Sequence, residues 1–186
     1  HLYNKTSGKA WNSSGISPAY YFQVSDLLKN FEIEKVLKNR NQAEILDYGS
    51  GGTLFLETIQ KFYPLTNCIG FDIGEESVNL KTNNLRMEKN LDYNSWLDRS
   101  IKKFDLIFLM SVYEHVDDIN SLLKKLRFAL KDNGILIIET GDSMSFWARL
   151  TGNKWHYRRI HEHIRISNRV SILKRLKHHG FSSFRV

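Results

Sequence analysis

The stretch that most constrains the fold runs from Glu44 to Asp72 and reads as two strands joined by a glycine-rich turn and a helix. The first strand is short and apolar, and Asp47 follows it just before glycines at positions 49, 51 and 52. Apolar residues then recur at helical spacing from Thr53 until Pro64, which cannot continue a helix. A second apolar strand ends at Asp72. This pattern predicts a βαβ unit, and parallel sheets built from such units bind ligands at the carboxyl ends of their strands.

The glycines and carboxylates of this turn indicate which kind of ligand it could hold. Glycines at positions 49 and 51 let the backbone approach a ligand closely, and a helix beginning near Thr53 presents unpaired N–H groups. Asp72 ends the neighbouring strand, 25 residues after Asp47, where a carboxylate can hold two ribose hydroxyls. Asp47 would repel a pyrophosphate, and Leu54 stands where a dinucleotide fingerprint has its third glycine. A nucleoside with a cationic amino-acid end therefore fits better, and a hydride-transfer enzyme is the weaker interpretation.

Four motifs, in order along the chain, carry a family resemblance. They are LDYGSGG, GFD, FDLIFLMSVYEHVDD and LRFALKDNGILIIETGD. Together, over roughly residues 41–181, they resemble the motifs of class I S-adenosylmethionine-dependent methyltransferases. The branch they resemble most is the small-molecule one that includes the quinone-biosynthesis O-methyltransferases. One departure is Thr53, which stands where the turn of that family usually has its third glycine.

The resemblance implies both a fold and a reaction. The fold is an α/β, Rossmann-like, doubly wound and mostly parallel sheet with helices on both faces, whose carboxyl-terminal strand hairpin we expect to be incomplete in this chain. The reaction is transfer of the methyl group of S-adenosylmethionine to a small-molecule acceptor, with an oxygen as the expected nucleophile and S-adenosylhomocysteine as the product. Two alternatives stay open: a nucleic-acid methyltransferase that uses the basic carboxyl-terminal region, and a non-catalytic cofactor-binding module.

The resemblance also assigns candidate site residues. The cofactor-binding candidates are Asp47, Gly49, Ser50, Gly51, Asp72, Ile73, Leu91, Asp92, Met110 and Ser111. Among them, Leu91 and Asp92 would contact the adenine, while Met110 and Ser111 would line the methyl end of the cofactor.

Three histidines are candidates for the catalytic base. An acceptor hydroxyl must lose its proton, and His115, His161 or His163 could take it. Each also has a structural interpretation, with His115 anchoring its loop and the other two forming buried hydrogen bonds. The His-Glu-His run has no third metal ligand nearby in sequence, so no metal site is predicted.

Positive charge is concentrated at the carboxyl end of the chain. Residues 154–186 hold nine lysines and arginines against a single acid, Glu162, whereas the whole chain has a formal net charge of +7. This surplus is either a solvated helix face or an attraction for an anionic acceptor, such as a phosphorylated or nucleotide-linked small molecule. Nucleic acid is the weaker interpretation, because no stacking motif is present and Ser-Val-Tyr-Glu replaces the N/D-P-P-Y/F motif that base-methylating enzymes often carry.

Length and composition suit one soluble domain. The 186 residues can bury a single core, no apolar run approaches the roughly 20 residues of a membrane helix, and the only cysteine, Cys68, lies in a strand. We therefore expect a cytoplasmic protein without a signal peptide or membrane insertion. Residues 1–40 are predicted to form a leader and helices, with the leader as a frayed end or a lid, and residues 41–186 the methyltransferase domain, with 141–166 as its substrate loop.

The remaining elements follow from local patterns. Pro18 is predicted to begin a helix, 33–38 a short second helix, and 84–91 a third strand. Asp117 or Asp118 would cap a helix whose apolar stripe ends at Leu130. Asp142 is expected to cap a short helix that Gly152 ends, and Ser167 a final helix, followed by a strand over 181–186.

Overall fold

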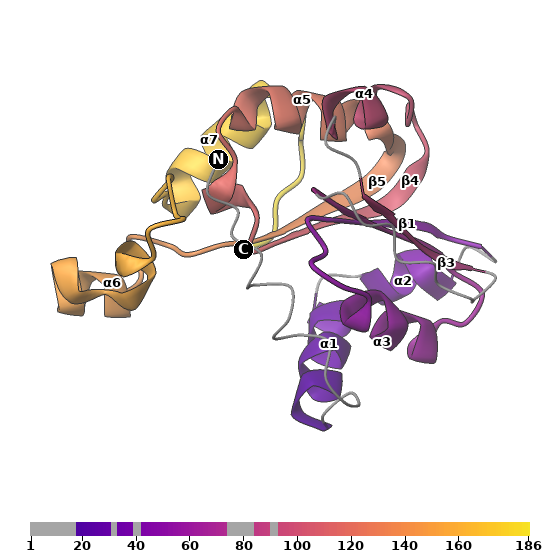
Figure 1. Cartoon of the computed structure of the whole chain (residues 1–186), viewed down its shortest axis with the longest axis horizontal. Coiled ribbons are helices and arrows are strands. Elements are labelled where there is room, and N and C mark those ends of the chain that lie inside the picture. Colours follow the sequence, from indigo (N-terminus) through magenta and orange to yellow (C-terminus); the bar gives the residue numbers. More distant parts are fainter. Residues whose placement is uncertain (1–17, 31–32, 39–41, 74–83, 90–92) are drawn as a thin grey trace.

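The computed structural model of the chain describes residues 18–30, 33–38, 42–73, 84–89 and 93–186 (Figure 1). Within these ranges five strands form one sheet in the order β3-β2-β1-β4-β5, and every neighbouring pair is parallel. The strands are β1 (Glu44–Tyr48), β2 (Asn67–Asp72), β3 (Leu85–Lys89), β4 (Phe104–Met110) and β5 (Leu130–Glu139). The helices are α1 (Pro18–Asn30), α2 (Ile33–Lys38), α3 (Leu54–Phe62), α4 (Tyr93–Asp98), α5 (Ile119–Ala129), α6 (Phe146–Thr151) and α7 (Arg169–His178).

Helices cover both faces of the sheet, because successive residues of a strand point to opposite faces. Ile45 of β1 belongs to a core cluster with α1, α2 and α3, whereas its neighbour Leu46 belongs to a second cluster with α4, α5 and α7. Leu106 and Ile107 of β4 divide between the two clusters in the same way. Figure 1 shows α1–α3 on one side of the strands and α4, α5 and α7 on the other. The prediction of a doubly wound α/β sheet is confirmed.

The strand order reverses at the carboxyl end of β1, and we refer to the region between the tips of β2 and β4 there as the crevice. The chain runs outward from β1 to β2 and β3, and then returns to place β4 on the other side of β1. Such a reversal is where open parallel sheets bind ligands, because the loops after the two flanking strands separate there. The predicted βαβ unit, from β1 through α3 to β2, supplies one wall of this crevice.

Two predicted helix caps are wrong by one and three residues. The cap of α7 is Asn168, not Ser167, because Asn168 is extended and its side chain accepts a hydrogen bond from the Ser171 amide, while the Ser171 hydroxyl pairs with the Asn168 backbone. The cap of α6 is Ser145, whose side chain accepts from the Ala148 amide. Asp142 instead accepts from the Met144 amide in the preceding turn. For α5 the cap is Asp118, one of the two predicted alternatives.

Residues 181–186 do not form the predicted strand. Phe181 and Phe184 both pack against the core cluster beside α5 and α7. Residues three apart point to opposite faces of a strand, so a strand could not bury both rings on the same core. Their burial therefore favours an irregular segment after Gly180, which has the left-handed φ of 83° that ends α7.

Strand β5 contains a bulge near its start. Leu130 pairs with Phe104 and Ile135 with Leu106, so four residues of β5 lie opposite a single residue of β4. The Asp-Asn-Gly run at 132–134 lies within this bulge, and Leu130, which was predicted to end the apolar stripe of α5, belongs to the strand. Helix α4 was not predicted, although Trp96 and Leu97 are buried in the core. No helix in the described ranges is both long and apolar enough to cross a bilayer.

Candidate active site

The glycine-rich turn after β1 is held against the end of β2. The Gly49 and Ser50 amides both donate to the Phe71 carbonyl, at 2.7 and 3.0 Å. Gly49 and Gly51 have φ of 79° and 59°, in the region that favours glycine. A side chain at Gly49 would also collide with Val112, 2.4 Å from the position of its Cβ. These two glycines are therefore required by backbone conformation and by close packing against the loop that follows β4.

Asp72 links the end of β2 to this turn. Its carboxylate is 8% exposed, and it accepts hydrogen bonds from the Gly51 amide at 2.5 Å and from the Ile73 amide at 2.6 Å. These two hydrogen bonds fix the orientation of the carboxylate against the turn. This places a fixed acceptor at the position predicted for ribose recognition.

Asp47 is a buried carboxyl group beside the same turn. Its side chain is 3% exposed, and no residue in the described ranges donates a hydrogen bond to it. Burial, and secondarily the charge of Asp72, raises the pKa of Asp47 to about 8. A cation brought next to Asp47 would favour its ionised form, which is the chemistry that a ligand with an ammonium group supplies.

The end of β4 carries a strained residue. Ser111 has a φ of 52°, which is uncommon for a residue with a side chain. Two hydrogen bonds to Glu139 at the end of β5 hold it there: the Ser111 amide donates to the Glu139 carbonyl and its hydroxyl to the Glu139 carboxylate, both at 2.9 Å. Strained backbone of this kind concentrates at functional sites.

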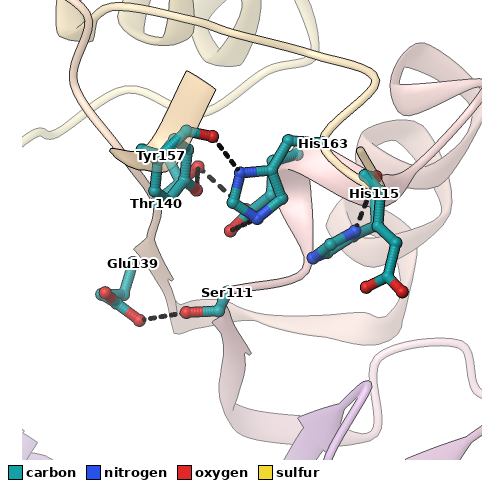
Figure 2. Close-up of polar contacts among 8 residues, drawn as sticks. Ser111, His115, Glu139, Thr140, Tyr157 and His163 are labelled. Atoms are coloured by element: carbon teal, nitrogen blue, oxygen red, sulfur yellow. Dashed lines mark hydrogen bonds and ion pairs between the residues drawn. The ribbon is translucent and has the colours of Figure 1, made fainter. Parts of the chain in front are cut away.

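A cluster of polar side chains lies beyond β4 and β5, where the loop after α6 folds back over the sheet (Figure 2). Glu114, in the 3-10 turn η2 (Tyr113–His115), is fully buried. Its Oε2 accepts a hydrogen bond from the Thr140 hydroxyl at 2.9 Å, and its Oε1 lies 3.9 Å from Nε2 of His163. Within the described residues Oε1 has no hydrogen-bond partner.

Tyr157 completes this cluster from the 3-10 turn η4 (His156–Arg159). Since the Thr140 hydroxyl donates its proton to Glu114, the Tyr157 hydroxyl, 3.0 Å away, donates to Thr140. Burial, followed by the nearby Glu114 carboxylate, raises the pKa of Tyr157 to about 12, so the phenol stays protonated. A side chain at Gly141 would lie 2.4 Å from the Tyr157 ring, so this glycine admits the tyrosine.

Two of the three predicted histidines meet in this cluster. His115 and His163 have ring centroids 4.8 Å apart, and Nδ1 of each faces a backbone carbonyl: that of Glu162 at 2.9 Å and that of Tyr157 at 2.8 Å. Because a carbonyl only accepts, Nδ1 carries the proton in both rings. His161 is exposed and lies outside the cluster.

The same cluster contains groups that metal ions prefer. Glu114, His115 and His163 each offer one ligand atom, and these atoms lie within 4.8 Å of one another. Glu114 and His115 lie far from His163 in the sequence, which is why the His-Glu-His run alone did not reveal this group. Sequence reasoning also missed Thr140 and Tyr157 as members of the site, and only the pairing of Glu114 with His115 in sequence could have pointed to the carboxylate.

The predicted cofactor residues converge on the crevice where the structure describes them. The tips of β1 and β2 and the turn between them carry six of these residues: Asp47, Gly49, Ser50, Gly51, Asp72 and Ile73. Across the crevice, Met110 is the last residue of β4 and Ser111 follows it. Leu91 and Asp92 lie outside the described residues.

Comparison with known proteins identifies the family. A family model of the methyltransferase domain matches residues 23–184. The chain belongs to the methyltransferase domain family. It is 27% identical over 151 residues to a protein named ubiquinone biosynthesis O-methyltransferase from Pelagibacter ubique, which covers 74% of this chain and 62% of that protein. The chain thus spans less than two thirds of this relative's length.

Solved methyltransferase structures share the fold. A SAM-dependent methyltransferase from Archaeoglobus fulgidus superposes with a TM-score of 0.60 at 18% identity, over 88% of this chain and 75% of that one. Human N-acetylserotonin methyltransferase in complex with SAM gives a TM-score of 0.61 at 16% identity, over 91% of this chain and 52% of that one. At these identities the likeness establishes a shared Rossmann-like methyltransferase fold and nothing finer.

Proposed function

We propose that this methyltransferase-family chain transfers the methyl group of S-adenosylmethionine to a hydroxyl oxygen of a small acceptor. The observation that carries the proposal is the pair of buried carboxyl groups, Asp47 and Asp72, at the tips of adjacent strands beside a glycine turn. Asp72 is held by two backbone amides, whereas Asp47 has no hydrogen-bond donor among the described residues. The O-methyltransferase name of the Pelagibacter relative supports oxygen as the acceptor atom.

The crevice residues fit S-adenosylmethionine by the chemistry of their groups. Asp72 would accept from the ribose hydroxyls, and Asp47 would pair with the ammonium group of the amino-acid end. Met110 and Ser111 would border the methyl end, and Leu91 and Asp92 stay candidates for the adenine contact. When bound, the cofactor supplies an electrophilic methyl group on a sulfonium, so the task left to the protein is to align the acceptor oxygen at about 3–3.5 Å.

His115 is the proposed proton acceptor. Its Nδ1 proton is held by the Glu162 carbonyl, so the lone pair of the neutral ring is on Nε2, as a general base requires. His163 is more enclosed and lies between the Tyr157 carbonyl and the Glu114 carboxylate, which suits a positioning role. Loop 141–166, which contains Tyr157 and His163, is the proposed border of the acceptor pocket.

The charge of the strand ends favours a neutral hydroxylated acceptor. Asp47, Asp72, Glu114 and Glu139 place four carboxyl groups at the carboxyl edge of the sheet. The basic residues of α7 belong to a helix on the α5 face of the sheet instead (Figure 1). Those of the four carboxyl groups that are ionised would repel a phosphorylated acceptor near the transferred methyl group.

The test is a methyl-transfer assay with labelled S-adenosylmethionine and a panel of phenols, catechols and aliphatic alcohols. We expect a labelled product whose rate of formation falls by about 10²–10⁴ in His115→Asn, because the proton acceptor is lost. His161→Asn is the matched control, since His161 lies outside the cluster, and it should keep the rate of the parent chain.

Two results would contradict this proposal. Transfer that is equally fast in His115→Asn would remove the proton-acceptor role. Binding of S-adenosylhomocysteine without transfer to any acceptor would instead favour a cofactor-binding module.

A further inference from the structure

The segment of residues 160–166 lies between the 3-10 turn η4 and α7, and it contacts the loop that carries His115. It consists of turn and irregular backbone. Its side chains Ile160 and Ile164 are 40% and 56% exposed, so the burial of these two aliphatic groups does little to hold the segment in place. Its position relative to His115 therefore depends on polar contacts.

Arg165 makes the strongest of these contacts, because it joins the segment to the loop between β4 and α5. Its backbone amide donates a hydrogen bond to the Glu114 carbonyl at 3.1 Å. One guanidinium nitrogen, Nη2, donates to the carbonyls of Val116 and Asp117, at 3.2 and 2.9 Å. A guanidinium group is planar and carries its donors in a fixed arrangement, so it holds the two carbonyls in a set geometry. Arg165 thus binds the backbone on both sides of His115.

The other polar contacts of the segment do not replace those of Arg165. Nδ1 of His163 donates to the carbonyl of Tyr157, which belongs to the preceding turn η4. Nε2 of His163 lies 3.9 Å from the Glu114 carboxylate, which is too far for a hydrogen bond. At the end of the segment, the Ser167 carbonyl accepts from the Ser143 amide, which ties the chain to residues after β5 and not to the loop of His115.

The contact that depends on this anchoring sets the tautomer of His115. The Glu162 carbonyl, shortly before Arg165, accepts hydrogen bonds from Nδ1 of His115 at 2.9 Å and from the Ile164 amide at 3.1 Å. The proton of a neutral histidine stays on the ring nitrogen that has an acceptor. If the segment moved away from the loop, Nδ1 would lose its acceptor, and the proton would be shared between the two ring nitrogens.

We propose that Arg165 is a positioning residue for methyl transfer, which holds the loop of His115 against the Glu162 carbonyl and thereby keeps the lone pair of the ring on Nε2. The inference rests on the proposed function, in which Nε2 of His115 takes the proton of the acceptor hydroxyl. Arg165 contacts backbone carbonyls of this loop, whereas Asp47 and Asp72 lie in β1 and β2. Loss of Arg165 should therefore slow the transfer and leave cofactor binding unchanged.

The tautomer is measured by nitrogen-15 NMR of the histidine rings, at a pH where they are neutral, with His115→Asn to assign the signals. We expect the Nδ1–H form of His115 in the parent chain and a mixture of both tautomers in Arg165→Ala. Arg169→Ala is the matched control, since it removes the same charge from the exposed first residue of α7, and it should resemble the parent chain. A His115 ring that stays in the Nδ1–H form in Arg165→Ala would overturn the proposal.

The effect on the reaction is measured with the labelled-methyl assay. We expect kcat to fall roughly 10–100-fold in Arg165→Ala, because displacement of a catalytic group by about an ångström has effects of this size. The affinity for S-adenosylhomocysteine should be unchanged. Arg165→Lys, which keeps the charge on a flexible stem, should show a smaller fall in kcat and a smaller share of the second tautomer. It also serves if Arg165→Ala does not fold, and a lysine at this position that matched the parent chain in both measurements would contradict the proposal.

Two further results would overturn the proposal. A mixed tautomer with unchanged kcat would show that the transfer does not need a fixed ring. A loss of cofactor affinity as large as the loss of kcat would show that Arg165 supports the whole carboxyl edge of the sheet. Absence of transfer to every acceptor would contradict the proposed function instead, and the NMR comparison, which needs neither cofactor nor acceptor, would still decide whether Arg165 fixes the His115 ring.

Discussion

At the tip of β1, the buried Asp47 carboxyl lies close enough to Asp72 for the charge of one to affect the other. Burial disfavours the charged form of Asp47, and the nearby negative charge disfavours it further, which together raise its pKa to about 8. A carboxyl group that costs stability when ionised is retained where a ligand can restore its charge. This is the reason for assigning Asp47 to the ammonium end of the cofactor.

The raised pKa of Asp47 predicts a pH dependence of stability. The unfolded chain ionises Asp47 near pH 4, whereas the folded chain keeps the proton until about pH 8. Between these values the folded state binds more protons, so the free energy of unfolding falls as pH rises, by up to about 1.4 kcal/mol per pH unit. Asp47→Asn, which imitates the protonated form, should flatten this dependence when urea unfolding is measured from about pH 5 to about pH 8.

If the free energy of unfolding of Asp47→Asn fell with rising pH as steeply as that of the parent chain, the titrating group would be a residue other than Asp47. Asp132→Asn is a suitable control, because Asp132 is exposed and pairs with Lys102 at the surface. Its pKa is lowered, chiefly by the hydrogen bond to Lys102, so it cannot produce the same loss of stability with rising pH.

The polar cluster shows what sequence could not predict at the scale of single residues. His115 and His163 were both candidates, but they are 48 positions apart, and nothing in their local sequence predicts rings 4.8 Å apart. The contact depends on how the loop after β5 folds back, which in turn depends on Tyr157 packing against Gly141. Side-chain constellations of this kind are set by tertiary packing and leave no periodic pattern.

Among the elements, the strands and the buried helix stripes could be predicted because their periodicity is set by burial. The sequence predicts α2 at its observed bounds, and the pattern over 44–72 predicts β1, α3 and β2. Ends and caps were less predictable, since Ser167 and Asn168 are both good capping residues and only the backbone conformation decides between them.

The assignment of Asn168 as the N-terminal cap of α7, in place of Ser167, can be tested by substitution. Asn168→Ala should lower the free energy of unfolding by about 1 kcal/mol, because it removes the acceptor for the Ser171 amide and breaks the reciprocal capping box. Ser167→Ala should change it by a few tenths of a kcal/mol at most. Urea unfolding of both variants measures the difference, and a larger effect at Ser167 would show that the cap is assigned to the wrong residue.

At the scale of the whole molecule, the sheet order decides where function can reside. Because β2 and β4 flank β1, the glycine turn, Asp72 and the strained Ser111 come from three strands but meet at a single edge. The family resemblance predicted this arrangement, and the match of the methyltransferase domain over residues 23–184 agrees with it.

Cofactor binding at the crevice can be measured by calorimetric titration of the chain with S-adenosylhomocysteine, repeated with Asp72→Ala. We expect micromolar binding, about −8 kcal/mol, weakened by roughly 1.5–3 kcal/mol in the variant because a charged hydrogen-bond acceptor is removed. Asp98→Ala, which alters an exposed carboxylate on α4, should bind like the parent chain. A folded chain that fails to bind at millimolar S-adenosylhomocysteine, or that binds equally well without the Asp72 carboxylate, would contradict the assignment of this crevice as the cofactor site.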